Sequence, residues 1–74
     1  MENRKANIKG RDLAFIRDKS GLRQIRVARA AGVPLQRLID IEKERVTVGS
    51  EVMQSLLDAI EQLAADAQAS GVGA

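Results

Sequence analysis

The sequence of 74 residues has no cysteine, histidine, tryptophan or tyrosine, and it contains one phenylalanine and one proline. Without cysteine no disulfide can form, and without cysteine and histidine no thiolate or imidazole metal site can form. The cysteine nucleophiles and histidine general bases of common acyl-transfer sites are missing as well. We therefore expect a protein that is not an enzyme and that binds no metal, cofactor or small-molecule ligand.

Long hydrophobic runs are also missing. No stretch approaches the roughly 20 consecutive apolar residues that a transmembrane helix needs. The N-terminal residues MENRKANIKG are charged and lack the apolar segment of a secretory signal. The expected location is the cytoplasm, with no membrane partner, and the length allows one small domain.

Aliphatic residues take the place of the missing aromatic ones. The chain has 11 alanines and 19 leucines, isoleucines and valines, and both alanine and leucine favour helices. No segment alternates apolar and polar residues for long enough to indicate a strand. The predicted fold is all-α, a small bundle of four to five helices with a long C-terminal helix.

Apolar spacing and helix-breaking residues give the predicted boundaries. Residues 1–8 are expected to form a flexible basic arm, residues 9–69 the folded domain, and residues 70–74 a disordered tail. Glycines at positions 21 and 32 end the first two helices, because glycine adopts the left-handed conformation that closes a helix. The predicted helices run from about Lys9 to Lys19, from Arg23 to Ala31, from Pro34 to Lys43 or Glu44, and, after Ser50 as N-cap, to near Ala69. The apolar positions of the last helix repeat at intervals of three and four and are Val52, Met53, Leu56, Leu57, Ile60, Leu63, Ala64 and Ala67.

The charged residues are divided unevenly along the chain. Residues 1–45 hold all 12 lysines and arginines and six acidic residues, a net charge of +6. Residues 46–74 hold four acidic residues and no basic one, a net charge of −4. A basic half on a small helical domain favours binding to a polyanion such as a nucleic acid. The alternative is an ordinary solvated surface on which the charges are separated by chance.

The most informative stretch is Gln24–Glu42, QIRVARAAGVPLQRLIDIE, in which two short helices are joined near Gly32. Helices that cross at a steep angle need a small residue at the crossing, here Ala28, and a turn residue that tolerates a positive φ, here Gly32. The aliphatic residues at buried spacings are Val27, Ala31, Val33, Leu38 and Ile41, and the polar face of the second helix carries Gln36, Arg37, Asp40 and Lys43. This is the pattern of a helix-turn-helix, over about residues 23–44.

On these residues, the segment from Leu22 to Ile60 resembles the Cro/phage-repressor-type helix-turn-helix proteins, the XRE family. The matching motifs are Leu22-Arg23-Gln24, Val27-Ala28, Gly32-Val33 and Ile41-Glu42, with Leu13, Ile16 and Arg17 upstream and Met53, Leu56 and Ile60 downstream. The resemblance implies a lambda-repressor-like fold and DNA binding. The sequence departs from the family at Pro34, where Ser or Thr is usual, at Glu44, where Gly is frequent, and at Phe15, which is usually polar.

Base contacts are expected on the exposed front of the helix that follows Gly32. Gln36 can pair with adenine and Arg37 with guanine. Asp40 can accept a hydrogen bond from cytosine, and Leu35 can lie against a thymine methyl group. The resemblance places Leu35, Gln36 and Asp40 at the family's main base-contacting positions. Phosphate repels Asp40 unless it pairs with cytosine or a neighbouring arginine, and each residue has the alternative of being an ordinary solvated one.

Phosphate contacts are expected near the start of the second predicted helix. Gln24 matches a family position that contacts the DNA backbone with help from the helix N-terminus. The other candidates are Arg23, Lys43, Arg26 and Arg45. Arg4 and Lys5 could reach a groove of DNA from the N-terminal arm, and a disordered tail is the alternative.

The resemblance also assigns structural roles. Arg17 and Glu42 match a family ion pair that ties the first helix to the end of the third. Two interpretations stay open for four aliphatic residues, which either cover the core or form a dimer interface: Val46, Val48, Leu63 and Ala67. A two-fold dimer would contact two half-sites about one helical turn of DNA apart.

The sequence thus predicts a sequence-specific double-stranded-DNA-binding transcriptional regulator, a Cro-like repressor or a controller-type autoregulator. It is expected to bind a palindromic operator as a homodimer and to associate with the nucleoid when bound. The alternative is a protein-interaction module with the same fold, such as an antitoxin or an anti-activator, which would use the acidic C-terminal helix. The retained basic residues Arg23, Arg37 and Lys43 favour DNA.

Overall fold

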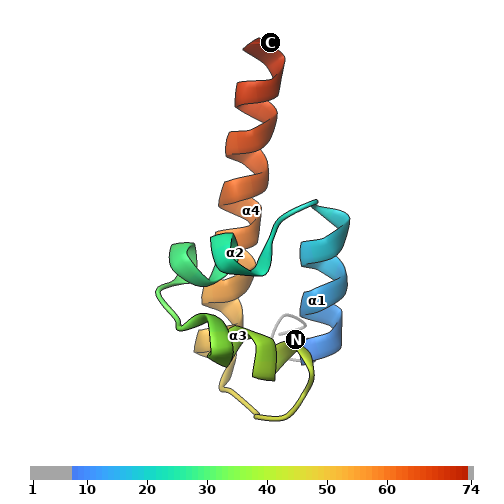
Figure 1. The fold of residues 1–74 in the computed structure, drawn as a ribbon, viewed down its shortest axis with the longest axis vertical. Coiled ribbons are helices and arrows are strands. Elements are labelled where there is room, and N and C mark those ends of the chain that lie inside the picture. Colours follow the sequence, from blue (N-terminus) through green and yellow to red (C-terminus); the bar gives the residue numbers. More distant parts are fainter. Residues whose placement is uncertain (1–7, 74) are drawn as a thin grey trace, which may run out of the picture.

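The chain folds into four helices in a computed structural model that describes the backbone of residues 8–73 and the side chains of residues 8–67. They are α1 (Gly10–Lys19), α2 (Gln24–Ala31), α3 (Leu35–Glu42) and α4 (Ser50–Gly73) (Figure 1). Residues 8–73 contain no strand, so the fold is all-α, as the sequence predicts. The predicted arm, with Arg4 and Lys5, lies outside the described residues except for Ile8.

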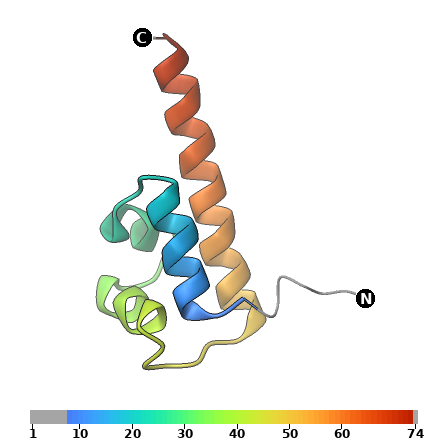
Figure 2. The same cartoon turned by 90° about the vertical axis from the view of Figure 1, so that its right-hand side faces the viewer.

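The three short helices gather along the N-terminal half of α4. Helix α1 packs against α3 and α4, and α2 packs against the same two helices. The C-terminal half of α4 projects beyond the other three helices (Figures 1 and 2). Among the described helices, none combines the length and the apolar character that crossing a membrane requires.

The core is built from aliphatic residues of all four helices. The buried apolar residues are Leu13, Leu22, Val27, Ala28, Leu38, Ile41, Met53, Leu56, Ala59 and Ile60, and the half-buried ones around them are Ile8, Ile16, Ala31, Val33, Val48, Leu57 and Leu63. The apolar face of α4 differs from the prediction at three positions. Ala59 is buried, whereas Val52 and Ala67 are exposed. Ala67 is exposed because it lies in the projecting half of the helix.

The single aromatic side chain lies outside this core. Phe15 is 65% exposed, and the Lys19 ammonium nitrogen lies 5.8 Å from the centroid of its ring. This distance is within the range of a cation–π contact. The exposed ring is thus accompanied by a cation of its own helix.

The turn between α2 and α3 depends on Gly32. This residue has φ 74°, in the left-handed region that glycine enters without steric cost. Just beyond it, the Val33 N–H donates to the Ala28 carbonyl at 3.0 Å, which satisfies a carbonyl at the end of α2. The predicted positive φ at Gly32 is therefore confirmed, and it turns the chain toward α3.

Several predicted helix boundaries differ from those of the structure by one residue or more. Pro34 precedes α3 instead of lying in its first turn, because its backbone is extended (ψ 146°) while its carbonyl accepts the Leu38 N–H at 3.1 Å. Ser50 is the first residue of α4 and not its cap, since the Gly49 carbonyl already accepts the Met53 N–H at 3.1 Å. Helix α4 extends to Gly73 instead of fraying near Ala69, and propensity does not explain the extension, since positions 70–73 hold two glycines and no alanine. The backbone of 70–73, predicted to be disordered, is therefore helical.

Glu44, just after α3, has an unfavourable backbone conformation. Its φ is 59°, in a region that costs a residue with a Cβ about 1–2 kcal/mol. Its carboxylate accepts the Arg11 backbone N–H at 3.1 Å, in the first turn of α1, and the Arg11 Nε lies 3.9 Å away. This hydrogen bond offsets part of the strain.

The two contributions can be separated by substituting Glu44 with glycine and with alanine. Both variants lose the carboxylate, but only glycine adopts φ 59° freely. Glu44→Gly is therefore expected to be more stable to urea than Glu44→Ala by about 1 kcal/mol. Equal stabilities of the two variants would contradict the strain at this position.

Candidate nucleic-acid interface

Helix α3 has one face in the core and one in solvent. Leu38, Ile41 and Glu42 are buried and fix the orientation of the helix. Three of the predicted base-contacting residues lie on the exposed side, in the first turn: Leu35, Gln36 and Arg37. Arg37 forms no ion pair with any side chain that the structure describes, so its guanidinium is available to a ligand.

Asp40, the fourth predicted base-contacting residue, is held by two neighbours. The Gln36 Nε2 donates to the Asp40 Oδ1 at 3.1 Å, and the Arg45 Nη1 lies 3.7 Å from the same oxygen. Arg45 is thus a neighbouring arginine of the kind expected to reduce repulsion between Asp40 and a phosphate. The structure therefore joins two predicted base-contacting residues and one predicted phosphate-contacting residue in one cluster.

The N-terminus of α2 lies open. Arg23 occupies the N-cap position in an extended conformation (φ −80°, ψ 151°), and its side chain accepts no hydrogen bond from the helix. The first N–H groups of α2 thus have no side-chain cap, and such groups are suited to an anion. Arg23 and Arg26 are both exposed beside them.

Gln24 occupies a different place from the one predicted. Its side chain is half-buried, and its Nε2 donates to the Glu42 Oε1 at 2.9 Å. The amide nitrogen is therefore bound inside the protein instead of facing a phosphate. The physical reason is that the buried Glu42 carboxylate requires hydrogen-bond donors, and Gln24 is placed to supply one.

The Glu42 carboxylate is the centre of a buried polar network. The Arg17 Nε lies 2.6 Å from its Oε2, and the Arg17 Nη2 donates to its Oε1 at 3.0 Å. The third guanidinium nitrogen, Nη1, donates to the Leu22 carbonyl at 2.7 Å. The expected ion pair is therefore present, and it ties α3 to α1 and to the chain before α2. The family resemblance implied the ion pair but not the Gln24 and Leu22 partners.

A close backbone contact at Gly10 also positions α3, and the sequence analysis missed it. A Cβ at this residue would lie 1.8 Å from the Ile41 carbonyl oxygen. The start of α1 therefore touches the end of α3, where only glycine leaves room. The one available signal was a glycine at the start of a predicted helix, a position where most residues would do better.

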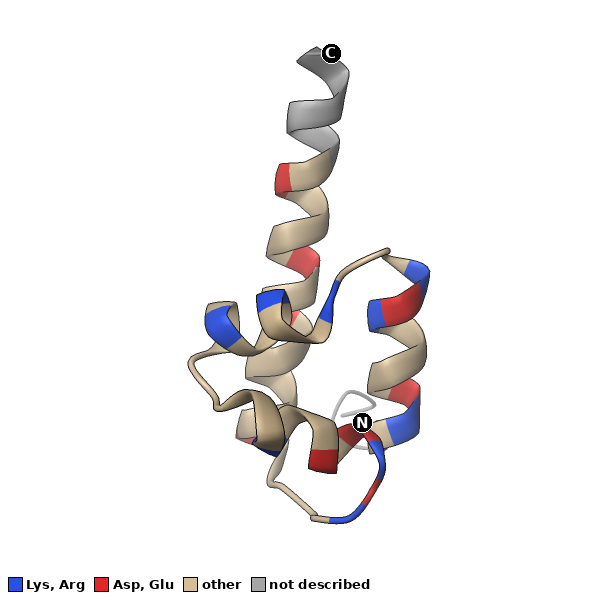
Figure 3. Ribbon diagram, in the orientation of Figure 1, with Lys and Arg blue, Asp and Glu red and all other residues tan. Residues whose placement is uncertain are grey.

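Basic residues surround α3 on two sides. In Figure 3, basic residues lie above α3, in α2, and below it, in the chain that follows α3. All the charged residues of α4 are acidic. The exposed candidates in these segments are Arg23, Arg26, Lys43 and Arg45. The separation of charge along the sequence thus corresponds to a separation in space.

The four candidates for a dimer interface do not form one surface. Val46 and Val48 belong to the connection between α3 and α4, and Leu63 and Ala67 belong to the far half of α4 (Figure 1). Val48 and Leu63 are half-buried against the core, whereas Val46 and Ala67 are exposed. The structure therefore places the four candidates at two separate positions, each with one exposed residue.

Comparison with known proteins gave no assignment. No protein-family model, no curated protein and no solved structure matches the chain significantly. Among the described residues, no three acidic side chains cluster closely enough to hold a metal ion. The functional interpretation therefore depends on the chemistry of the exposed face of α3 and its surroundings.

Proposed function

We propose that the protein is a sequence-specific double-stranded-DNA-binding transcriptional regulator, in which α2, the turn at Gly32 and α3 act as a helix-turn-helix. The observation that carries this proposal is the exposed first turn of α3. There Leu35, Gln36 and Arg37 project from a helix whose opposite face is fixed in the core. The major groove of B-DNA admits an α-helix and presents a distinct pattern of donors and acceptors for each base pair.

The chemistry of these side chains suits base edges. Arg37 can donate two hydrogen bonds to guanine, and Gln36 can both donate to and accept from adenine once it leaves Asp40. Leu35, 37% exposed, supplies an apolar contact for a thymine methyl group. The three together would distinguish several neighbouring base pairs.

Contacts to the DNA backbone would fix the register of α3. The uncapped N–H groups of α2 and the exposed Arg23 and Arg26 support phosphate binding on one side of α3. Lys43 and Arg45 support it on the other side. We propose that the backbone of Gln24, and not its side chain, takes part, because the side-chain nitrogen donates to Glu42.

We further propose that a homodimer binds a palindromic operator, as a Cro-like repressor or a controller-type autoregulator does. A two-fold dimer matches the symmetry of such a site. Val46 and Ala67 are the exposed residues among the four interface candidates, and a partner copy would cover them. Regulation would then follow from the concentration of the protein itself and from the overlap of its operator with a promoter.

Substitution of Arg37 tests the assignment of base contacts. Arg37→Ala is expected to weaken binding to a duplex selected from a random pool about tenfold to hundredfold, and to change binding to unrelated duplexes much less. Arg26→Ala is expected to weaken binding to all duplexes similarly. It is also expected to reduce the slope of the logarithm of the binding constant against the logarithm of salt concentration by about one. Fluorescence anisotropy at several salt concentrations measures both effects.

The matched control is Gln62→Ala, an exposed substitution on α4. It is expected to leave the affinities for the selected duplex and for unrelated duplexes unchanged. If Arg37→Ala weakened the selected and the unrelated duplexes equally, Arg37 would be a phosphate contact and the proposed base recognition at this position would be wrong.

A further inference from the structure

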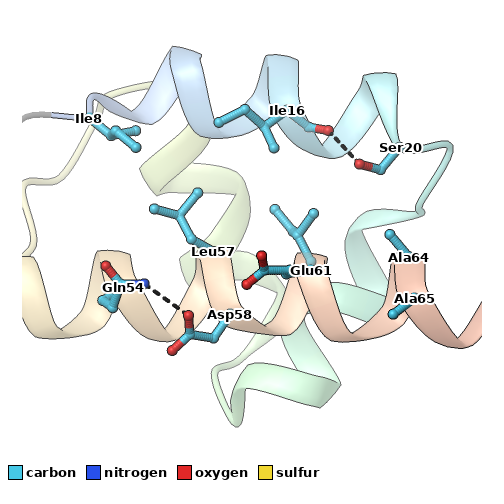
Figure 4. Close-up of a pocket in the computed structure, with 10 residues that line it drawn as sticks. Ile8, Ile16, Ser20, Gln54, Leu57, Asp58, Glu61, Ala64 and Ala65 are labelled. Carbon is cyan, nitrogen blue, oxygen red and sulfur yellow. Dashed lines mark hydrogen bonds between the residues drawn. The ribbon is translucent and has the colours of Figure 1, made fainter. Parts of the chain in front are cut away.

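An apolar groove runs between α1 and α4. It has a volume of about 560 Å³, and the residues that line it include Ile8, Ile16, Leu57, Asp58, Glu61 and Ala64 (Figure 4). In Figure 4, Ile8 and Ile16 point from the α1 side toward α4, and Leu57 points back toward α1. The groove therefore has an aliphatic floor formed by two helices.

This floor is only partly covered. Ile16 and Leu57 are half-buried against the core, as is Ile8 at one end of the groove. Small side chains, Ala64 and Ala65, keep the far end open. Aliphatic side chains of a second molecule have room here, because α4 continues past the end of α1 (Figure 2).

Two carboxylates accompany the apolar floor. Asp58 and Glu61 are exposed on α4, and neither forms an ion pair with a side chain that the structure describes. Asp58 accepts a hydrogen bond from the Gln54 Nε2 at 2.8 Å, which holds it in place. Because residues 46–74 contain no lysine or arginine, α4 itself supplies no cation for them.

The groove lies away from the face assigned to DNA. Its lining residues come from α4, from α1 and from the residues next to α1, and none comes from α2 or α3. A molecule bound between α1 and α4 would leave the first turn of α3 free. Occupation of the groove is thus compatible with DNA binding and does not depend on it.

From these observations we propose that the α1–α4 groove binds an amphipathic, lysine- or arginine-rich helix of a partner protein. Its apolar residues, three and four positions apart, would pack on Ile16, Leu57 and Ala64, and its cations would pair with Asp58 and Glu61. A second copy that binds through its own α4 fits less well, because that helix would bring the same carboxylates against these. DNA is excluded from this groove by the repulsion between carboxylate and phosphate.

A synthetic helix tests the proposal directly. The probe is a fluorescein-labelled peptide of about 15 residues, since shorter isolated helices are unstable, with leucine on one face and lysine elsewhere. We expect saturable binding to the full chain by fluorescence anisotropy, with amide shifts in NMR spectra concentrated at Ile16, Leu57 and Ala64. A peptide of the same charge with serine in place of leucine is expected not to bind.

Two double variants with the same change in net charge separate the groove from general electrostatics. Asp58→Asn with Glu61→Gln is expected to weaken probe binding about fivefold, from the loss of two exposed ion pairs. The variant with Glu51→Gln and Asp66→Asn removes the same two charges elsewhere on α4, and Asp66, like Asp58, accepts a hydrogen bond from a glutamine. This variant is expected to leave probe binding unchanged.

Three results would overturn the proposal. The serine peptide binding as well as the leucine peptide, or both double variants losing affinity equally, would show attraction by net charge alone. The groove would belong to a second copy if the wild-type protein sedimented as a dimer and the variant with Asp58→Asn and Glu61→Gln sedimented as a monomer. In that case the probe peptide would also fail to displace the second copy. Absence of saturable probe binding to the folded wild-type chain would equally refute it.

Discussion

Replacing Glu42 with alanine is expected to lower the free energy of unfolding by about 3–5 kcal/mol, because it leaves a buried arginine without its counter-ion. The Arg17 side chain is 14% exposed and that of Glu42 5%, so water cannot replace the lost carboxylate. Gln24 loses its acceptor at the same time. A chain of this length has about 4–11 kcal/mol of stability in total, so the variant is expected to be partly unfolded.

Chemical denaturation monitored by circular dichroism measures this effect. Glu61→Ala, an exposed glutamate of α4, is the matched control and is expected to change stability by less than about 0.5 kcal/mol. Arg17→Met combined with Glu42→Leu is expected to recover much of the loss, because the uncompensated charge is removed as well.

The same variant separates stability from recognition. Glu42 is buried and lies on the core face of α3, so any loss of DNA binding by Glu42→Ala should accompany its loss of folding. If the variant melted like the wild-type protein and yet no longer bound DNA, the structural assignment of Glu42 would be wrong.

Replacing Gly10 with alanine is the second substitution with a large expected effect, a loss of about 3 kcal/mol. Alanine is normally better than glycine in a helix by about 1 kcal/mol, which alone would predict a more stable protein. Here the added Cβ would lie 1.8 Å from the Ile41 carbonyl oxygen, a backbone atom that cannot rotate away. The start of α1 must then move away from the end of α3, and such overpacking lowers the free energy of unfolding.

Gly49→Ala is the matched control, because a Cβ at Gly49 meets no atom within 4 Å. It is expected to change the free energy of unfolding by less than about 0.5 kcal/mol. Thermal unfolding of both variants beside the wild-type chain measures the difference. Equal melting temperatures for Gly10→Ala and Gly49→Ala would show that α1 and α3 do not touch at this point.

Features that follow from local chemistry could be predicted from the sequence. The left-handed conformation at Gly32 follows from a glycine between two amphipathic stretches, and the buried Leu38 and Ile41 follow from helical spacing. The exposure of Leu35, Gln36 and Arg37 follows from the same spacing. These features need no knowledge of which helices meet.

Features that depend on which backbones meet could not be predicted. The contact of Gly10 with Ile41 joins residues 31 positions apart, and the one signal, a glycine at the start of a predicted helix, does not say which backbone it meets. The prediction of a phosphate contact for Gln24 rests on its match to a family position, but the buried carboxylate of Glu42 binds its side chain instead. Glu44 keeps a glycine-like φ at a cost that its hydrogen bond to the Arg11 N–H of another helix partly offsets.

Selection of duplexes from a random-sequence pool by the full chain, at two salt concentrations, tests the central claim most directly. We predict enrichment of a palindromic or nearly palindromic sequence that is bound about a thousandfold or more tighter than bulk DNA. The preference should persist at the higher salt concentration, although both affinities fall. Weak binding without an enriched sequence, lost as salt rises, would contradict the proposed regulator and leave only a basic surface with general affinity for polyanions.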